Sequence, residues 1–344
     1  MASSTPKATE ERLQQIRQAA AEGHLHADSQ THPRIQGHDS YYGLPALKPP
    51  TWTWEVPLYF FLGGISGVSS SIALAAQIFG ADPALIRLSL WIALVGAGIC
   101  PALLIADLGR PSRFLNMLRM FKLQSPMSVG SWVLVAFSGC AFLSVLTNEL
   151  VLHGHVFFAL IGLRWIGEAS AALVGLLLAS YTGVLIGATA IPVWSQNRRL
   201  LPLHFLVSGL GGAAGILELA GFLIPATHFL GFVASGIETA AEILFEFRKS
   251  PADAPLHRGR AGFTFLISGI LEGPAALGVR LLWGSTPTGR EAAAICFLAG
   301  ALLSRYAWIW AGRASAKLPD DQFAMQRRKL QSREPGVPSK PRVS

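Results

Sequence analysis

The run Asp107–Met127, DLGRPSRFLNMLRMFKLQSPM, has residue types and spacing suited to proton chemistry at a membrane surface. It follows a long apolar stretch, so Asp107 stands where a membrane helix would end. A carboxylate at that depth is costly unless it is paired or used. Arg110, three residues later, offers a local ion pair, which is the purely structural alternative. After Pro111 the apolar residues fall on one helical face, which predicts a short helix lying in the membrane interface.

A second set of carboxylates stands inside apolar runs of the C-terminal half: Glu218, Glu238, Glu242 and Glu272. Glu238 and Glu242 are one helical turn apart and share a face, and Glu272 is expected at a similar depth to Glu238. Each ionised group there costs about 3 kcal/mol unless it is paired or neutralised. Arg280 and Arg305 lie in the same runs. Two interpretations therefore remain open: a path that hands protons along, or Glu–Arg pairs that hold helices together.

Neither set contains the residues of a redox metal centre. The three cysteines, Cys100, Cys140 and Cys296, stand alone in apolar runs without a CxxC motif, so we expect no iron–sulfur cluster and no structural zinc. A haem would need a pair of histidines within the bundle. His204 and His228 are expected near opposite ends of adjacent helices. The sequence therefore predicts no haem, no iron–sulfur cluster and no metal site in this chain.

Composition indicates which class of protein positions these groups. Of the 344 residues, 51% are hydrophobic and 14% are charged, whereas average soluble domains carry about 25% charged residues. A bilayer core needs about 20 consecutive apolar residues. Eight runs of that kind are predicted to span a membrane: Pro57–Phe79, Leu88–Ala106, Met127–Thr147, Ala169–Trp194, Leu203–Phe222, His228–Phe247, Ala261–Trp283 and Ala292–Ala311. The sequence thus predicts an all-α integral membrane protein of eight transmembrane helices.

The runs differ in a way that predicts two four-helix bundles. The first four carry no charged residue, whereas the last four carry carboxylates or arginines. We expect residues 51–200 to form the first bundle, with the chemistry that centres on Asp107, and residues 201–312 to form the second. A polar tail, residues 1–50, precedes them and includes a predicted helix, Ala8–Ala21. A basic tail, residues 313–344, follows.

Basic residues predict the orientation in the membrane. The predicted loops on the side of the N-terminus hold ten lysines and arginines, and those on the opposite side hold three, Arg87, Arg164 and Arg290. Cytoplasmic loops carry the excess of basic residues, so we expect both termini to be cytoplasmic in a multi-pass protein of the cell inner (plasma) membrane. Orientation and anionic lipid headgroups account for the net charge of +8 better than nucleic acid does.

The run from Asp107 to Trp132 closely resembles a motif of the NrfD/PsrC family, the membrane subunits of polysulfide-reductase-like molybdoenzyme complexes. The run WEVPLYFFLGGISG, Trp54–Gly67, resembles that family's other motif. With the eight-helix layout, the resemblance covers roughly Trp52 to Gly312. It implies the membrane anchor of an anaerobic respiratory oxidoreductase, a subunit that does not itself catalyse the substrate half-reaction.

The resemblance also implies ligands and partners. The cofactor would be a bound quinone, with menaquinone the expected type, and the partners would be a [4Fe–4S] iron–sulfur subunit and a molybdopterin-containing catalytic subunit. A carboxylate can relay protons and a tyrosine hydroxyl can donate a hydrogen bond to a quinone carbonyl. The positions that correspond to the family's quinone-contacting groups are Glu55, Asp107 and Tyr181, the last matched by its span and depth alone. Tyr59, near Glu55, and Arg110, near Asp107, are predicted to belong to the same site.

The main alternative is a proton-coupled secondary transporter. Glu238 and Glu272 would suit proton-coupled transport, and Gly273 with Pro274 could break a helix at a binding site. The two halves of the chain show no convincing repeat, however, and the run Asp107–Met127 has no role in transport. These observations favour the quinone-linked subunit.

Overall fold

The computed structural model describes residue 47, residues 49–108, 110, 112, 114–119, 121–247 and 250–317. In this part of the chain, eight helices are long and apolar enough to cross a membrane. The predicted all-α membrane fold with eight spanning helices is therefore confirmed. The helix predicted at Ala8–Ala21 lies outside the described residues.

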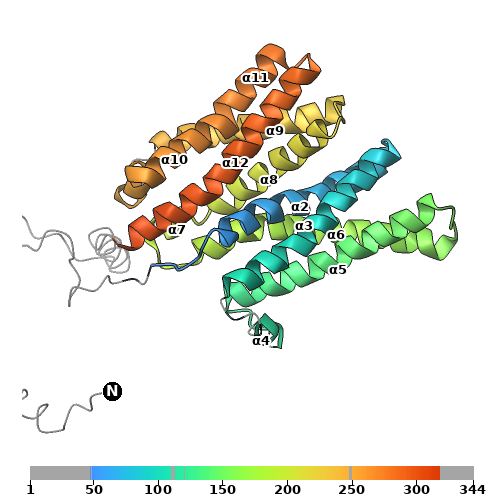
Figure 1. Cartoon of the computed structure of the whole chain (residues 1–344), viewed down its shortest axis with the longest axis horizontal. Coiled ribbons are helices and arrows are strands. Elements are labelled where there is room, and N and C mark those ends of the chain that lie inside the picture. Colours follow the sequence, from blue (N-terminus) through green and yellow to red (C-terminus); the bar gives the residue numbers. More distant parts are fainter. Residues whose placement is uncertain are drawn as a thin grey trace, which may run out of the picture. The chain divides into compact units, whose positions relative to one another are not determined.

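Four helices pack in a ring as the first bundle (Figure 1). They are α2 (Glu55–Ile78), α3 (Pro83–Asp107), α5 (Pro126–Leu152) and α6 (Phe158–Gly187). The short helix predicted after Pro111 is present as α4 (Phe114–Arg119), which contacts α5. It lies at the end of the bundle where α2 begins and α3 ends, so the Asp107 segment is at that end.

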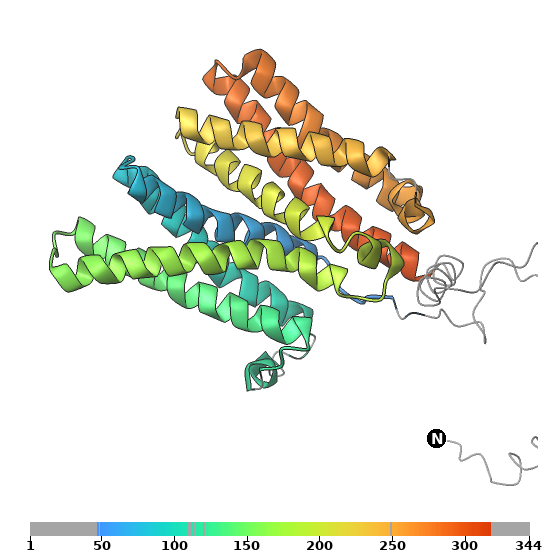
Figure 2. The same ribbon diagram turned by 180° about the vertical axis from the view of Figure 1, so that it is seen from behind.

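The second bundle, in the C-terminal half, is also a ring of packed helices (Figure 2). Its helices are α8 (Leu200–Leu219), α9 (Pro225–Phe247), α10 (Gly259–Ile270), α11 (Ala276–Trp283) and α12 (Pro287–Ala316). A π-helical turn, η3 (Leu271–Ala275), joins α10 to α11, and the three elements form one spanning helix. Two short helices, α7 (Pro192–Gln196) and η2 (Pro251–Leu256), complete this part of the fold. The bundles meet where α8 packs on α2 and α6 and where α12 packs on α2.

Three spanning helices begin with a polar N-cap residue followed by proline, a combination that satisfies a free backbone N–H and fixes the first helical turn. In α3 the Asp82 carboxylate accepts a hydrogen bond from the Ala84 N–H at 2.9 Å, and Pro83 follows it. The helix then continues through Pro101 to Asp107. The same helix thus carries one aspartate as its cap and a second at its opposite end.

The predicted start of the fourth span, at Ala169, was wrong, because α6 begins at Phe158. Arg164 Nε contacts Glu168 Oε1 at 2.8 Å, and Arg164 also donates to Gln77. These two charges compensate each other inside the helix, so a search for uncharged runs excluded them. Arg164, which was predicted to lie in a loop, therefore lies inside α6.

Helices α2 and α6 are in close backbone contact where two glycines face each other. A Cβ atom added to Gly67 would overlap the Gly175 carbonyl, and one added to Gly175 would overlap the Gly67 carbonyl. Small residues allow membrane helices to pack at this distance. The contact fixes α2, the helix that presents Tyr59, against α6.

Gly67→Ala is expected to destabilise the protein by about 1–3 kcal/mol, because the backbone of α6 must move to admit the methyl group. Thermal unfolding of the purified protein in detergent measures the change. Gly98→Ala is the matched control, since a Cβ there has no atom within 4 Å. Equal unfolding midpoints for the two variants would contradict this helix contact.

Candidate functional site

A cavity of about 280 Å³ lies at the end of the first bundle where α2 begins and α3 ends. Its walls are mostly apolar and aromatic, including Trp52, Phe60 and Leu104. The polar side chains in its lining are those of Tyr59, Asp107 and Ser131, besides the indole N–H of Trp52. An apolar pocket with a few convergent polar groups is the usual form of a small-molecule site.

Asp107 is held at this cavity by Thr53, in the segment before α2. The backbone N–H of Thr53 donates to Asp107 Oδ1 at 3.1 Å, and its hydroxyl lies 3.0 Å from the same oxygen. The hydroxyl also contacts the carboxylate of Glu55. Thr53 therefore links Glu55 to Asp107. Arg110 is exposed, and no ion pair joins it to Asp107 among the residues that the structure describes.

Aromatic contacts with the second bundle fix the segment that carries Thr53. The ring of Trp52 stacks on that of Trp194 with centroids 5.5 Å apart. The hydroxyl of Tyr306 donates to the Trp54 carbonyl at 3.1 Å. Contacts on both sides of Thr53 thus hold it opposite the end of α3. The sequence analysis missed Thr53 and Trp52, which precede the helix and lie outside any periodic pattern.

The two predicted tyrosines occupy different places. Tyr59, on α2, is buried and lines the cavity beside Cys100, whose thiol lies 3.9 Å from the Tyr59 carbonyl. Tyr181, on α6, does not line it. The Tyr181 ring packs against Gly130 of α5 so closely that a Cβ atom added to Gly130 would overlap the ring. The next residue in the chain, Ser131, lines the cavity. Tyr181 therefore supports the wall from behind.

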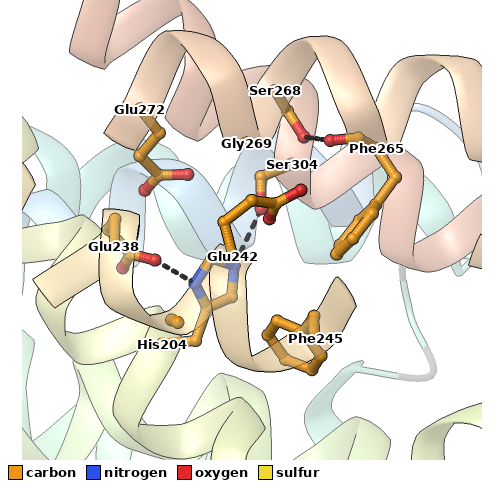
Figure 3. A pocket seen from close by; sticks show the side chains of 10 residues that line it. His204, Glu238, Glu242, Phe245, Phe265, Ser268, Gly269, Glu272 and Ser304 are labelled. Atoms are coloured by element: carbon orange, nitrogen blue, oxygen red, sulfur yellow. Dashed lines mark hydrogen bonds and ion pairs between the residues drawn. The ribbon is translucent and has the colours of Figure 1, made fainter. Parts of the chain in front are cut away.

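A second polar cluster lies inside the second bundle (Figure 3). His204 of α8 has Nδ1 2.7 Å from Glu238 Oε2 of α9 and Nε2 2.9 Å from Ser304 Oγ of α12. Glu272 of η3 completes the group: one donor atom from each of His204, Glu238 and Glu272 lies within 4.8 Å of the others, and all three side chains are buried. The structure thus brings the predicted Glu238 and Glu272 together and adds His204, which the sequence analysis considered only as a haem ligand.

The other predicted carboxylates are arranged differently. Glu242 lines the small cavity at this cluster, about 10 Å³ in volume, and packs against Gly269. Glu218 lies apart, with its two oxygens bound by the two terminal nitrogens of Arg280 at 2.8 and 2.7 Å. Both members of this pair are fully buried. The Glu–Arg interpretation thus fits Glu218, whereas no arginine forms an ion pair with the other three carboxylates in the described part of the chain.

Arg305 lies between the cluster and the first bundle. Its guanidinium carbon is 3.8 Å from the centroid of the Phe205 ring, and Nη2 donates to the Phe205 carbonyl at 3.2 Å. Phe205 in turn packs on Phe60, which lines the first-bundle cavity, with centroids 6.0 Å apart. This aromatic layer separates the cavity from Arg305.

Comparison with known proteins identifies the family to which the chain belongs. The family model described as polysulphide reductase, NrfD, matches residues 45–228, more than half of the chain and all of the cavity lining. The C subunit of polysulfide reductase from Wolinella succinogenes is 31% identical over 202 residues, which cover 54% of this chain and 61% of that relative. The match thus spans less than two thirds of the relative's length. This protein belongs to the polysulphide reductase NrfD family and is a membrane subunit of that family.

Proposed function

We propose that this chain is the membrane anchor and quinone- or quinol-reactive subunit of a respiratory oxidoreductase complex. The observation that carries the proposal is the first-bundle cavity, which places Asp107 and Tyr59 at one end of an otherwise apolar bundle. A quinone head is a flat apolar ring with two carbonyl oxygens. It therefore needs apolar walls and a few hydrogen-bonding groups.

The polar groups of the cavity suit proton-coupled quinone chemistry. Reduction of a quinone takes two electrons and two protons, and oxidation of a quinol releases them. Asp107 would exchange protons with the bound head, and the Tyr59 hydroxyl would donate a hydrogen bond to a carbonyl oxygen. The Thr53 hydroxyl, which contacts both carboxylates, would pass protons between Asp107 and the partly exposed Glu55. Arg110 would supply positive charge near the mouth, and Tyr181 would shape the wall.

Electrons would come from or go to partner subunits. The name of the Wolinella relative describes one subunit of a polysulfide reductase, which supports assembly of this protein with others. The proposed partners are a [4Fe–4S] subunit that docks at the cavity end and a molybdopterin-containing subunit that carries out the substrate half-reaction. Menaquinone is the proposed quinone.

We place both termini in the cytoplasm and the protein in the cell inner membrane. An even number of spanning helices puts the two ends of the chain on one side. Basic residues gather at the same end as the cavity, including Arg198, Arg199, Arg258 and Arg260. The positive-inside rule then makes that end cytoplasmic.

The second bundle would carry protons in step with quinone chemistry. Glu242, Glu238 and Glu272 are the proposed carriers, because they share one buried cavity. Glu218 was predicted to belong to the same path. Since Arg280 occupies both of its oxygens, we propose a stabilising role for it instead.

Ser131→Phe tests the quinone site by filling the cavity from α5. The added ring should raise the KM for quinol of the assembled complex by at least about tenfold, because steric exclusion from a close-fitting pocket has effects of this size. Ser180→Phe, at a partly exposed position of α6, is the matched control. An unchanged quinol titration in an assembled Ser131→Phe complex would contradict the proposed site.

A further inference from the structure

The second bundle contains buried carboxylates of two kinds. Glu218 is fully compensated by Arg280. Glu238 and Glu272 are 5% and 1% exposed, and Oε1 of each is buried without a hydrogen-bond partner in the part of the chain that the structure describes. No arginine among the described residues forms an ion pair with either carboxylate. A buried carboxylate is strongly unfavourable unless it is protonated or paired, so either a proton or a cationic occupant would relieve the charge here.

The charges around the cluster define the charge of that occupant. Glu238 and Glu242 face it from α9, Glu272 from η3 and His204 from α8, while Arg305 of α12 is held on Phe205. With these three carboxylates and the Arg305 guanidinium ionised and His204 neutral, the net charge is −2, three negative charges against one positive. One divalent cation would neutralise it.

The size and donor set of the site select among cations. The cavity, about 10 Å³, has room for one water-sized occupant and excludes an organic ligand. One imidazole and two carboxylates suit zinc and its neighbours, whereas magnesium and calcium prefer oxygen alone. Donor atoms within 4.8 Å of one another need only small side-chain shifts to reach the separation of about 3.3 Å around tetrahedral zinc.

The histidine is also oriented as in metal sites. Nδ1 of His204 faces the carboxylates, while Nε2 contacts Ser304 at 2.9 Å. Metal-binding histidines commonly have their second ring nitrogen hydrogen-bonded in this way, which fixes the ring. Figure 3 shows His204, Glu238 and Glu272 directed toward one another from three elements.

A larger cavity adjoins the cluster on the side of the bundle where α9 ends. This cavity, of about 470 Å³, shares Glu242, Phe245 and Phe265 with the small one. Its lining also includes His257 and Glu246, which are exposed. An ion entering there would pass Glu242 to reach His204.

We propose that His204, Glu238 and Glu272 bind one divalent transition-metal ion of the zinc type, with Glu242 beside it. The donors come from three elements far apart in the chain, so their spacing in the sequence gave no reason to expect a metal site. The proposal does not depend on quinone binding. A bound metal ion would occupy the carboxylates proposed to carry protons, so added zinc should also slow proton movement.

The test is zinc binding to the full-length chain, purified in detergent and stripped of metal. Equilibrium dialysis with metal analysis should find one tightly bound zinc ion per chain, in addition to any zinc bound by the histidines of the N-terminal tail. Zinc should also raise the unfolding temperature of the protein. Glu272→Gln and His204→Gln should weaken that binding at least about tenfold. His257→Gln and Glu246→Gln are matched controls, with the same residue types in exposed positions, and should bind zinc as the wild type does.

Equal zinc affinity and stoichiometry in the wild type and in Glu272→Gln would overturn the proposal, as would the absence of zinc binding beyond the tail. Ser304→Ala keeps all three ligands and is the second variant if a ligand variant fails to fold. It should weaken binding by about 10–100-fold through loss of the histidine's partner, and unchanged binding would contradict the site. Because no quinone is present, failure of the quinone proposal leaves these outcomes unaffected.

Discussion

Asp107→Asn is expected to slow quinone-linked turnover of the assembled complex by about a hundredfold or more, the usual contribution of a general acid or base. Asparagine can still accept the two hydrogen bonds that Thr53 directs at Oδ1. It cannot carry a proton, however. The variant should therefore insert and assemble normally while losing proton exchange with the quinone head, as measured by quinol oxidation or quinone reduction in the purified complex.

Asp82→Asn is the matched control for this experiment, because it makes the same chemical change at the opposite end of α3. Asparagine is as good an N-cap as aspartate, so folding should be retained and turnover should stay at the wild-type level. Wild-type turnover in an assembled Asp107→Asn complex would remove Asp107 from the mechanism.

Glu218→Ala should cause the largest loss of stability, about 3–5 kcal/mol, because it leaves the Arg280 charge buried and unpaired. Thermal unfolding in detergent, together with the amount of assembled complex, measures the effect. The double variant Glu218→Leu/Arg280→Met should recover most of the loss, since apolar residues of similar volume often replace a buried ion pair at little cost.

The same pair of variants separates the two roles considered for Glu218. A Glu218→Ala protein that unfolds at the wild-type temperature but moves protons more slowly in sealed vesicles would return Glu218 to the proton path. A destabilised single variant with a stable, proton-moving double variant would assign it to the structure of the bundle.

Apolar runs of about 20 residues predicted the spanning helices, because a bilayer demands such runs whatever the tertiary contacts. The error at α6 has a local cause. Arg164 and Glu168 are four residues apart on one helix and neutralise each other. A pair of this kind is visible in the sequence, but the apolar-run criterion treats its members as two separate charges.

The candidate sites could be predicted only where a motif or a membrane depth marked the residue. Asp107 stood out on both grounds. Glu218 and Glu238 could not be distinguished, since both are glutamates in apolar runs and the partner of Glu218 lies 62 residues away. His204 could not be assigned to a cluster whose other members lie 34 and 100 residues distant. Residues so far apart in the chain are brought together by packing between helices, which cannot be read from the sequence of any one helix.

Photolabelling with a reactive quinone analogue in the assembled complex locates the quinone site directly. A quinone site in the first bundle predicts label in peptides containing Trp52–Phe60 and Asp107–Ser131. Natural quinone should compete with the label, and Ser131→Phe should suppress it. Labelling confined to peptides of residues 200–316, or labelling that Ser131→Phe leaves unchanged, would contradict a quinone site in the first bundle.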